Sequence, residues 1–281
     1  MSFASSAAEA GNRITRSAGH SVHRARKPAF YLVTAAFLAF LLFALGESMT
    51  MAASGWFGGY EFPIHRVHHV VIGGMLTVFA ATIAVQLYRP TRRIGALQAA
   101  IVFAAAALGV TLVASGPGAA AEILAFVVPV ALIAALHPAR DQLVPTLERL
   151  DRRLLALAAV GALGFGAMAV GEFVNQTTLG DEHVLMGHYE FMSFALLSVG
   201  VFAILASFRP AGWRALVYAA AAVVVVFAAA SLAFPGLEQG SSLGTAASLG
   251  AIGWAIAFVG LAEYVDRVDP RDSERAVDTE R

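Results

Sequence analysis

The sequence predicts an all-α, polytopic integral membrane protein with about eight transmembrane helices. Hydrophobic residues make up 58% of the 281 residues, charged residues make up only 14%, and the mean hydropathy is +0.71. A soluble domain carries about 25% charged residues, so most of this surface is expected to face lipid. Apolar runs close to the ~20 residues that a helix needs to cross a bilayer also recur along the chain.

The apolar runs define the expected membrane helices. Proline- and glycine-containing breaks such as Arg89-Pro90 and Gly116-Pro117-Gly118 separate them. We interpret the runs as helices because a bilayer offers no hydrogen-bond partner to unpaired backbone groups. Their approximate ranges are 29–46, 66–87, 95–115, 119–136, 154–171, 186–207, 214–234 and 244–264.

Basic residues predict how these helices are oriented. If the N-terminus is cytoplasmic, every one of the 19 lysines and arginines except Arg66 falls in a cytoplasmic segment, as the positive-inside rule requires. We therefore expect a multi-pass protein of the cell (plasma) membrane with both termini cytoplasmic. The expected partners are the lipid bilayer and other membrane subunits, and nucleic acid is not expected because topology accounts for the basic residues.

The chain also shows the pattern of an internal duplication. Gly46-Glu47 and Gly171-Glu172 are expected to end the first and fifth helices, and His68 and His188 lie 120 residues apart, as do the two Arg-Pro pairs. Four spans per unit predict two parallel halves related by an axis along the membrane normal. Chance similarity among helices rich in alanine and valine is the alternative. The expected organisation is a disordered or interface-lying cytoplasmic leader at 1–28, a first four-helix repeat at 29–140, a cytoplasmic linker at 141–153, a second repeat at 154–265, and a disordered cytoplasmic tail at 266–281.

Histidines gather where the second and sixth helices begin on the outer side. Imidazole and carboxylate groups together suit zinc, iron or copper, and nearby thioethers would favour Cu(I). Glu190 is expected about one helical turn inside the sixth helix, where an acid is a functional candidate. The predicted metal ligands are His65, His68, His69, His183, His188, Glu47, Glu172 and Glu190, and the nearby methionines are Met49, Met51, Met186 and Met192.

A haem held by His68 and His188 is the alternative cofactor, if the second and sixth helices face each other. No complete metal signature such as H-E-x-x-H is present, so hydrated interfacial histidines that bind nothing are a further alternative. The absence of cysteine excludes disulfides, thiolate ligands and cysteine nucleophiles.

Three functions follow from these observations. The first is metal or haem binding on the extracytoplasmic side, for redox chemistry, metal handling or oxidase assembly. The second is a proton-coupled secondary transporter with its site between the two repeats and Glu190 or Glu122 as the proton carrier. The third is a membrane scaffold without a ligand. No phosphate loop and no Ser-His-Asp set identifies an enzyme.

Overall fold

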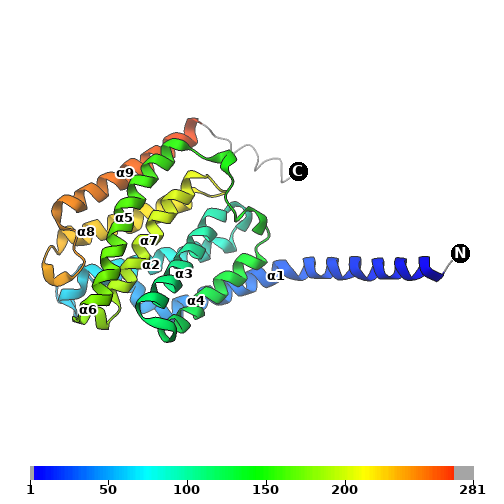
Figure 1. The fold of residues 1–281 in the computed structure, drawn as a ribbon, viewed down its shortest axis with the longest axis horizontal. Helices are drawn as coiled ribbons and strands as arrows, with labels where there is room; N and C mark the ends of the chain where they lie inside the picture. The colour runs from blue at the N-terminus through cyan, green and yellow to red at the C-terminus, as the bar shows by residue number, and fades with distance from the viewer. Residues whose placement is uncertain (1–2, 269–281) are drawn as a thin grey trace.

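The computed structural model describes the backbone of residues 3–268 and the side chains of residues 26–268. Over these residues the fold is helical without strands (Figure 1). Eight described segments are long and apolar enough to cross a membrane, which confirms the predicted all-α polytopic class. The long helices are α1 (Phe3–Ser54), α2 (Arg66–Ala84), α3 (Ile94–Ala114), α4 (Gly116–Leu136), α5 (Arg152–Thr178), α7 (His188–Ser207), α8 (Arg214–Ala233) and α9 (Gly244–Val268).

Short helical turns fill the connections between the long helices. Proline begins two of the 3₁₀ turns. Its lack of an N–H costs nothing there, because an N–H at the first helical position has no intrahelical partner. Asp151 caps α5 by accepting hydrogen bonds from the N–H groups of Arg153 (2.9 Å) and Leu154 (3.0 Å). The short elements are η1 (Pro63–His65), η2 (Val85–Leu87), η3 (Pro90–Arg92), η4 (Arg140–Gln142), η5 (Leu147–Arg149), α6 (Glu182–Leu185) and η6 (Leu237–Gln239).

Two expected helix ends were wrong. Glu47 and Glu172 lie inside α1 and α5, which continue to Ser54 and Thr178. A single glycine before each acid does not stop a helix, because it costs only about 1 kcal/mol there and no proline follows. The segment expected as a disordered or interface-lying leader has helical backbone from Phe3 onward. Of the expected tail, residues 269–281 lie outside the described part of the chain.

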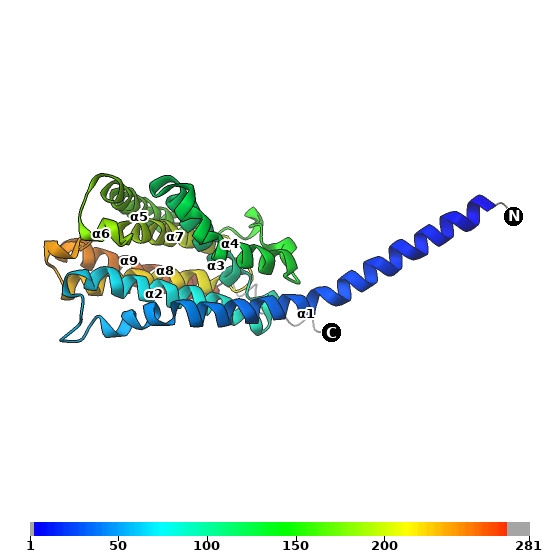
Figure 2. The same ribbon diagram turned by 90° about the horizontal axis from the view of Figure 1, so that it is seen from below.

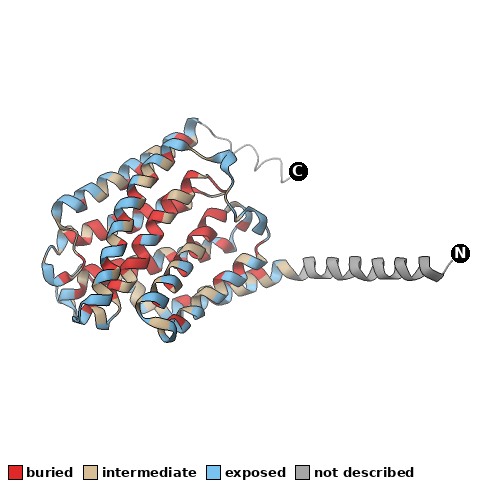
Figure 3. Cartoon of the chain, in the orientation of Figure 1, coloured by how far each residue is buried: buried red, intermediate tan, exposed pale blue. Residues whose placement is uncertain are grey.

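Four inner helices form the centre of the bundle and four outer helices surround them (Figure 3). In α2, α3, α7 and α8, 50% to 67% of the apolar segment is buried, against 17% to 28% in α1, α4, α5 and α9. The outer helices therefore present most of their apolar side chains to lipid. Both the second and the sixth membrane spans, which carry histidines, belong to the inner group.

Glycines allow the outer helices to approach the inner ones and each other closely. A Cβ atom at Gly73 of α2 would lie 2.4 Å from the backbone nitrogen of Ala52 in α1. A Cβ atom at Gly161 of α5 would lie 2.4 Å from the indole ring of Trp254 in α9. Small residues at such positions are the usual means of close helix packing in lipid, where burial from water supplies no driving force.

The two ends of the bundle differ in the residues that they carry. The histidine-bearing elements η1 and α6 meet at one end, and the described N-terminal part of the chain extends from the other (Figure 2). At this second end Arg26 donates hydrogen bonds to the carbonyl oxygens of Leu136 (3.2 Å) and His137 (2.5 Å). These bonds fasten the start of the first membrane span to the end of α4.

Candidate metal centre

The structure brings five histidines into one buried cluster, which we call the histidine cluster. The rings of His68 and His188 stack with centroids 4.8 Å apart and an interplanar angle of 24°. The members are His65, His68, His69, His183 and His188, and each is buried. Both halves of the chain contribute, because the first three come from η1 and α2 and the last two from α6 and α7.

Three of these histidines direct ring nitrogens at one point. The Nδ1 atom of His183 lies 3.1 Å from Nδ1 of His65 and 3.3 Å from Nδ1 of His188. One potential ligand atom from each of the three lies within 4.8 Å of the others. Nitrogen ligands at about 2.0–2.1 Å from a common ion are separated by about 3–3.5 Å from their neighbours. The two closest separations therefore match the edges of a coordination polyhedron.

Asp181 holds α6 in the orientation that points His183 into the cluster. Its carboxylate accepts hydrogen bonds from the N–H of Val184 (3.0 Å) and from the hydroxyl of Tyr189 (2.9 Å). Burial raises the pKa of Asp181, but these hydrogen bonds, together with smaller contributions from His183, outweigh that effect and the pKa lies below its ordinary value. Gly187 then turns the chain into α7 with a left-handed φ of 67°, which glycine adopts without steric cost.

The connection between α8 and α9 covers the cluster. Gln239 fastens it to the start of α2, since its side chain donates to the carbonyl of Pro63 (2.8 Å) and accepts from the N–H of Val67 (3.3 Å). Gly240 packs so closely that a Cβ atom there would lie 2.8 Å from Cε1 of His68. Its φ of 77° also favours glycine.

The same connection fixes the tautomer of His183. Its Nε2 lies 3.0 Å from the carbonyl oxygen of Glu238. A carbonyl only accepts, so Nε2 carries the proton and a neutral His183 keeps an unprotonated Nδ1. This arrangement, a ring nitrogen donating to the backbone while the other is left free, is how metal-binding histidines are commonly oriented.

A hydrogen-bonded chain orients His68 in a similar way. Ser241 donates to Glu172 (2.8 Å), so its oxygen is left to accept from Nε2 of His68 (2.7 Å). The remaining nitrogen of His68, Nδ1, is buried and has no hydrogen-bond partner. Such an atom is costly unless something binds it. The His68 ring lies 4.7 Å from the ring of His183 and 4.8 Å from the ring of His188, measured between centroids.

His69 is paired with a tyrosine at the edge of the cluster. The hydroxyl of Tyr60 lies 2.6 Å from Nδ1 of His69. Burial, with a smaller contribution from Glu61, raises the pKa of Tyr60 against the lowering effect of Arg66. The hydroxyl therefore stays protonated at neutral pH and donates to Nδ1, which places the proton of a neutral His69 on Nε2.

The acids predicted as ligands lie in three different settings. Glu47 is exposed on α1, and among the described residues its carboxylate makes no hydrogen bond or ion pair with the histidines. Glu172 is buried and reaches the cluster through Ser241. Glu190 is half-buried and accepts hydrogen bonds from Thr111 of α3 and from Ser115, the residue between α3 and α4.

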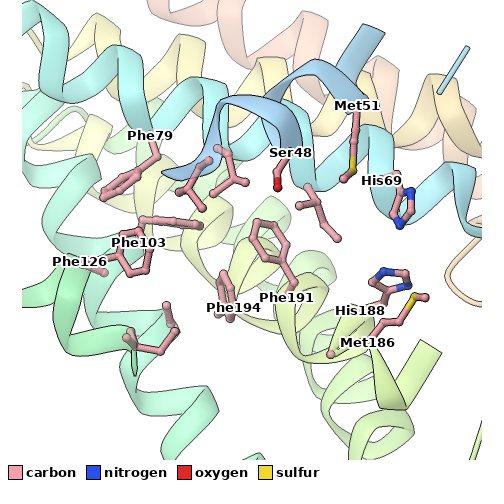
Figure 4. Close-up of a pocket in the computed structure, with 17 residues that line it drawn as sticks. Ser48, Met51, His69, Phe79, Phe103, Phe126, Met186, His188, Phe191 and Phe194 are labelled. Carbon is pink, nitrogen blue, oxygen red and sulfur yellow. The ribbon is translucent and has the colours of Figure 1, made fainter. Parts of the chain in front are cut away.

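The methionines are also divided. Met51 and Met186 line a cavity beside His69 and His188 (Figure 4). Met192 is buried in the apolar core, and Met49 packs against that core.

Several residues at the centre have no signal in the sequence. The connection between α8 and α9 contains Gln239, Gly240 and Ser241. From the sequence it was interpreted only as a break between two membrane helices, at Pro235-Gly236. Tyr60 precedes the histidine motif as one aromatic residue among many. The one available indication was position, since the α8–α9 connection was expected on the same side of the membrane as the histidines. Comparisons with protein-family models, with curated proteins and with solved structures give no match for this chain.

Proposed function

We propose that this protein binds a transition-metal ion through His65, His183 and His188 on the extracytoplasmic side of the cell membrane. The proposal follows from the convergence of their Nδ1 atoms at 3.1 and 3.3 Å. Hydrated interfacial histidines that bind nothing would direct their nitrogens at water, whereas these side chains are buried. The ion would serve redox chemistry, metal handling or oxidase assembly.

His68 is the residue best placed to add a fourth ligand. Its Nδ1 is buried, unprotonated in the hydrogen-bonding scheme above, and without a partner. Glu172 and Ser241 would then act as the outer support that orients a ligand and raises its basicity. In this interpretation Glu172 acts through Ser241 rather than as a ligand.

The arrangement of the rings favours a metal ion over haem. A haem held by His68 and His188 needs the two rings on opposite faces of the porphyrin. These rings instead stack on each other at 4.8 Å, which leaves no space for a porphyrin between them. Imidazole nitrogens bind zinc, copper, iron and nickel, and the thioethers of Met51 and Met186 beside the cluster add a preference for copper.

Neither alternative function has comparable support. A transporter would need a mid-membrane acid with freedom to exchange protons, but Glu190 is engaged by two hydroxyl groups and Glu122 is exposed on α4. A scaffold gives no reason for ring nitrogens of three buried histidines, His65, His183 and His188, to lie within 4.8 Å of one another.

We also infer that the two halves arose by duplication and are related by an axis along the membrane normal. The packing supports this, since α1 contacts α2 as α5 contacts α7, and α3 contacts α4 as α8 contacts α9. Between the halves, α3 contacts α7 as α8 contacts α2. In each half the first and fourth membrane spans are outer helices, and the second and third are inner helices.

The connections at the arginine-rich end support the same inference. Arg89 and Arg209 have φ values of 50° and 49°, and no other described non-glycine residue has a positive φ. Each precedes a proline. The two connections also touch, because the N–H of Gly95 donates to the carbonyl of Ala211 (2.9 Å). The duplication predicts that superposition of the halves brings His68 onto His188, and an inverted best superposition would contradict it.

Metal content tests the proposed site directly. Protein purified in detergent should contain close to one metal ion per chain by elemental analysis. His183→Ala and His188→Ala should each lose most of it. His137→Ala is the matched control, because His137 is equally buried but lies at the opposite end of the bundle, and it should keep the wild-type content.

Reconstitution with copper tests whether histidines are the ligands. Apoprotein loaded with Cu²⁺ should give an electron paramagnetic resonance spectrum with hyperfine coupling from several imidazole nitrogens, and His183→Ala should reduce that coupling. Wild-type protein without stoichiometric metal, and without binding of added Cu²⁺ or Zn²⁺, would refute the proposal.

A further inference from the structure

A cavity of about 340 Å³ adjoins the histidine cluster inside the membrane region (Figure 4). Its walls come from α1, α2, α3, α4 and the beginning of α7. Small-molecule sites in proteins have volumes of about 300–1,000 Å³, so the cavity has room for a compact organic molecule. Five aromatic side chains contribute to its walls, namely Phe79, Phe103, Phe126, Phe191 and Phe194.

The lining of the cavity selects a neutral ligand. Its 17 residues include no aspartate, glutamate, lysine or arginine. No side chain of the lining would therefore supply a counter-charge to a phosphate head group or an ionised fatty acid, and burying such an unpaired charge in an apolar environment is costly. The polar side chains that it does have, Ser48, His69 and His188, can exchange hydrogen bonds with a neutral group.

The polar and aromatic residues lie at opposite ends. Figure 4 shows His69 and His188 together at one end and Phe79, Phe103 and Phe126 at the other. The two imidazole rings are 5.0 Å apart between centroids. Because Tyr60 occupies Nδ1 of His69, the Nε2–H of His69 is the donor that remains for a ligand. A carbonyl oxygen at the polar end of the ligand would match this donor.

We propose that this cavity binds a lipid-soluble quinone, with one ring carbonyl hydrogen-bonded to His69 and the isoprenoid chain along the phenylalanines. A quinone is neutral, carries carbonyl oxygens on a planar ring, and is soluble in the bilayer. Planar rings pack well against the edges and faces of aromatic side chains. The outer helices α1 and α4, which contribute Leu45 and Ile123 to the walls, are mostly lipid-exposed, so the ligand would arrive from the bilayer.

This inference rests on the proposed function in one respect only. His188 lines the cavity and also belongs to the proposed metal site, so a bound quinone ring would lie beside the ion. Binding of the quinone itself does not need the metal, and the two proposals can therefore fail separately.

A pair of phenylalanine substitutions on α3 tests the site. The probe is a short-chain benzoquinone with one isoprene unit, titrated into the purified full-length protein and followed by equilibrium binding. Ala107 is buried and lines the cavity, so Ala107→Phe fills it. Leu112 on the same helix is 49% exposed, so Leu112→Phe is the matched control. Ala107→Phe should weaken binding at least about tenfold, and Leu112→Phe should leave it unchanged.

A second variant and a competitor complete the test. His69→Leu removes the donor without filling the cavity, and it should weaken quinone binding by about fivefold to tenfold. This variant keeps the proposal testable if Ala107→Phe does not fold. Equal binding by wild type, Ala107→Phe and His69→Leu would overturn the proposal. Displacement of the quinone by equimolar oleic acid would also overturn it, since the cavity would then accept acyl chains in general.

Metal content is measured on the same samples. Ala107→Phe should keep its metal while it loses the quinone. His183→Ala should still bind the quinone, because His183 does not line the cavity. Absence of metal with intact quinone binding would count against the proposed metal site alone, and the reverse result would count against the quinone site alone.

Discussion

The Nδ1 atoms of His65 and His183 lie 3.1 Å apart although 118 residues separate them in the chain. Each histidine stands on a short helical turn just before an inner helix, η1 before α2 and α6 before α7. Because His183 donates through Nε2 to the carbonyl of Glu238, its Nδ1 offers a lone pair toward His65. Two ring nitrogens at this distance need a shared proton or a shared metal ion between them.

Acid should release the metal. A histidine binds a metal ion only through an unprotonated nitrogen, and the ordinary pKa of histidine is about 6.5. Because burial disfavours the charged imidazolium, these buried histidines should become protonated only below that ordinary value. Metal affinity should therefore be constant above about pH 7 and should fall below about pH 6.5, more steeply than for one titrating ligand. Equilibrium dialysis from about pH 3 to 8 measures this, and an affinity that does not change over the whole range would show that histidines are not the ligands.

Ser241→Ala should weaken metal binding without unfolding the protein. The substitution removes the hydroxyl that links His68 to Glu172, and loss of such an outer partner typically reduces metal affinity about 10–100-fold. Ser242→Ala is the control, because the neighbouring hydroxyl bonds only to the backbone carbonyl of Ser231, at 3.4 Å. Metal titration measures the affinity of both variants. Equal affinities would show that His68 is not a ligand of the metal ion.

Single cysteines can test the topology, because the natural chain has none. Phe57→Cys and Leu179→Cys should react with a membrane-impermeant thiol reagent in intact cells. Val144→Cys and Leu147→Cys, which replace exposed side chains in the connection between α4 and α5, should react only after the membrane is opened. Reaction of Leu147→Cys in intact cells would contradict the predicted orientation.

Substitution of two glycines of α5 by alanine should have opposite effects on the stability of the protein. Gly161 lies against the ring of Trp254, so a methyl group there must displace the indole that donates to the carbonyl of Leu157 (2.9 Å). Overpacking of this kind costs about 1–3 kcal/mol. Gly164 has open space around its Cα, and Gly164→Ala should leave stability unchanged or raise it by up to about 1 kcal/mol. Thermal unfolding in detergent measures both, and a stable Gly161→Ala would show that α9 is packed differently.

The helices of this protein could be predicted from the sequence because their cause is local. Lipid requires each spanning segment to satisfy its own backbone hydrogen bonds, so the apolar runs alone predicted eight spans. The same local information placed two groups of histidines at the starts of two helices on one side of the membrane. It failed at Glu47 and Glu172, because a glycine–acid pair does not by itself end a helix.

The arrangement of the histidine cluster, in contrast, depends on tertiary structure. Which nitrogen of His183 or His68 is free depends on Glu238 and Ser241, which follow these histidines by 55 and 173 residues in the chain. Glu190 was grouped with the histidines by sequence distance, yet its position on α7 directs it to Thr111 of α3. Hydropathy determines which segments cross the bilayer, whereas the direction of a side chain depends on how each helix is rotated against its neighbours. That rotation is set by close contacts such as those at Gly73 and Gly240, and such contacts exist only after the helices have packed.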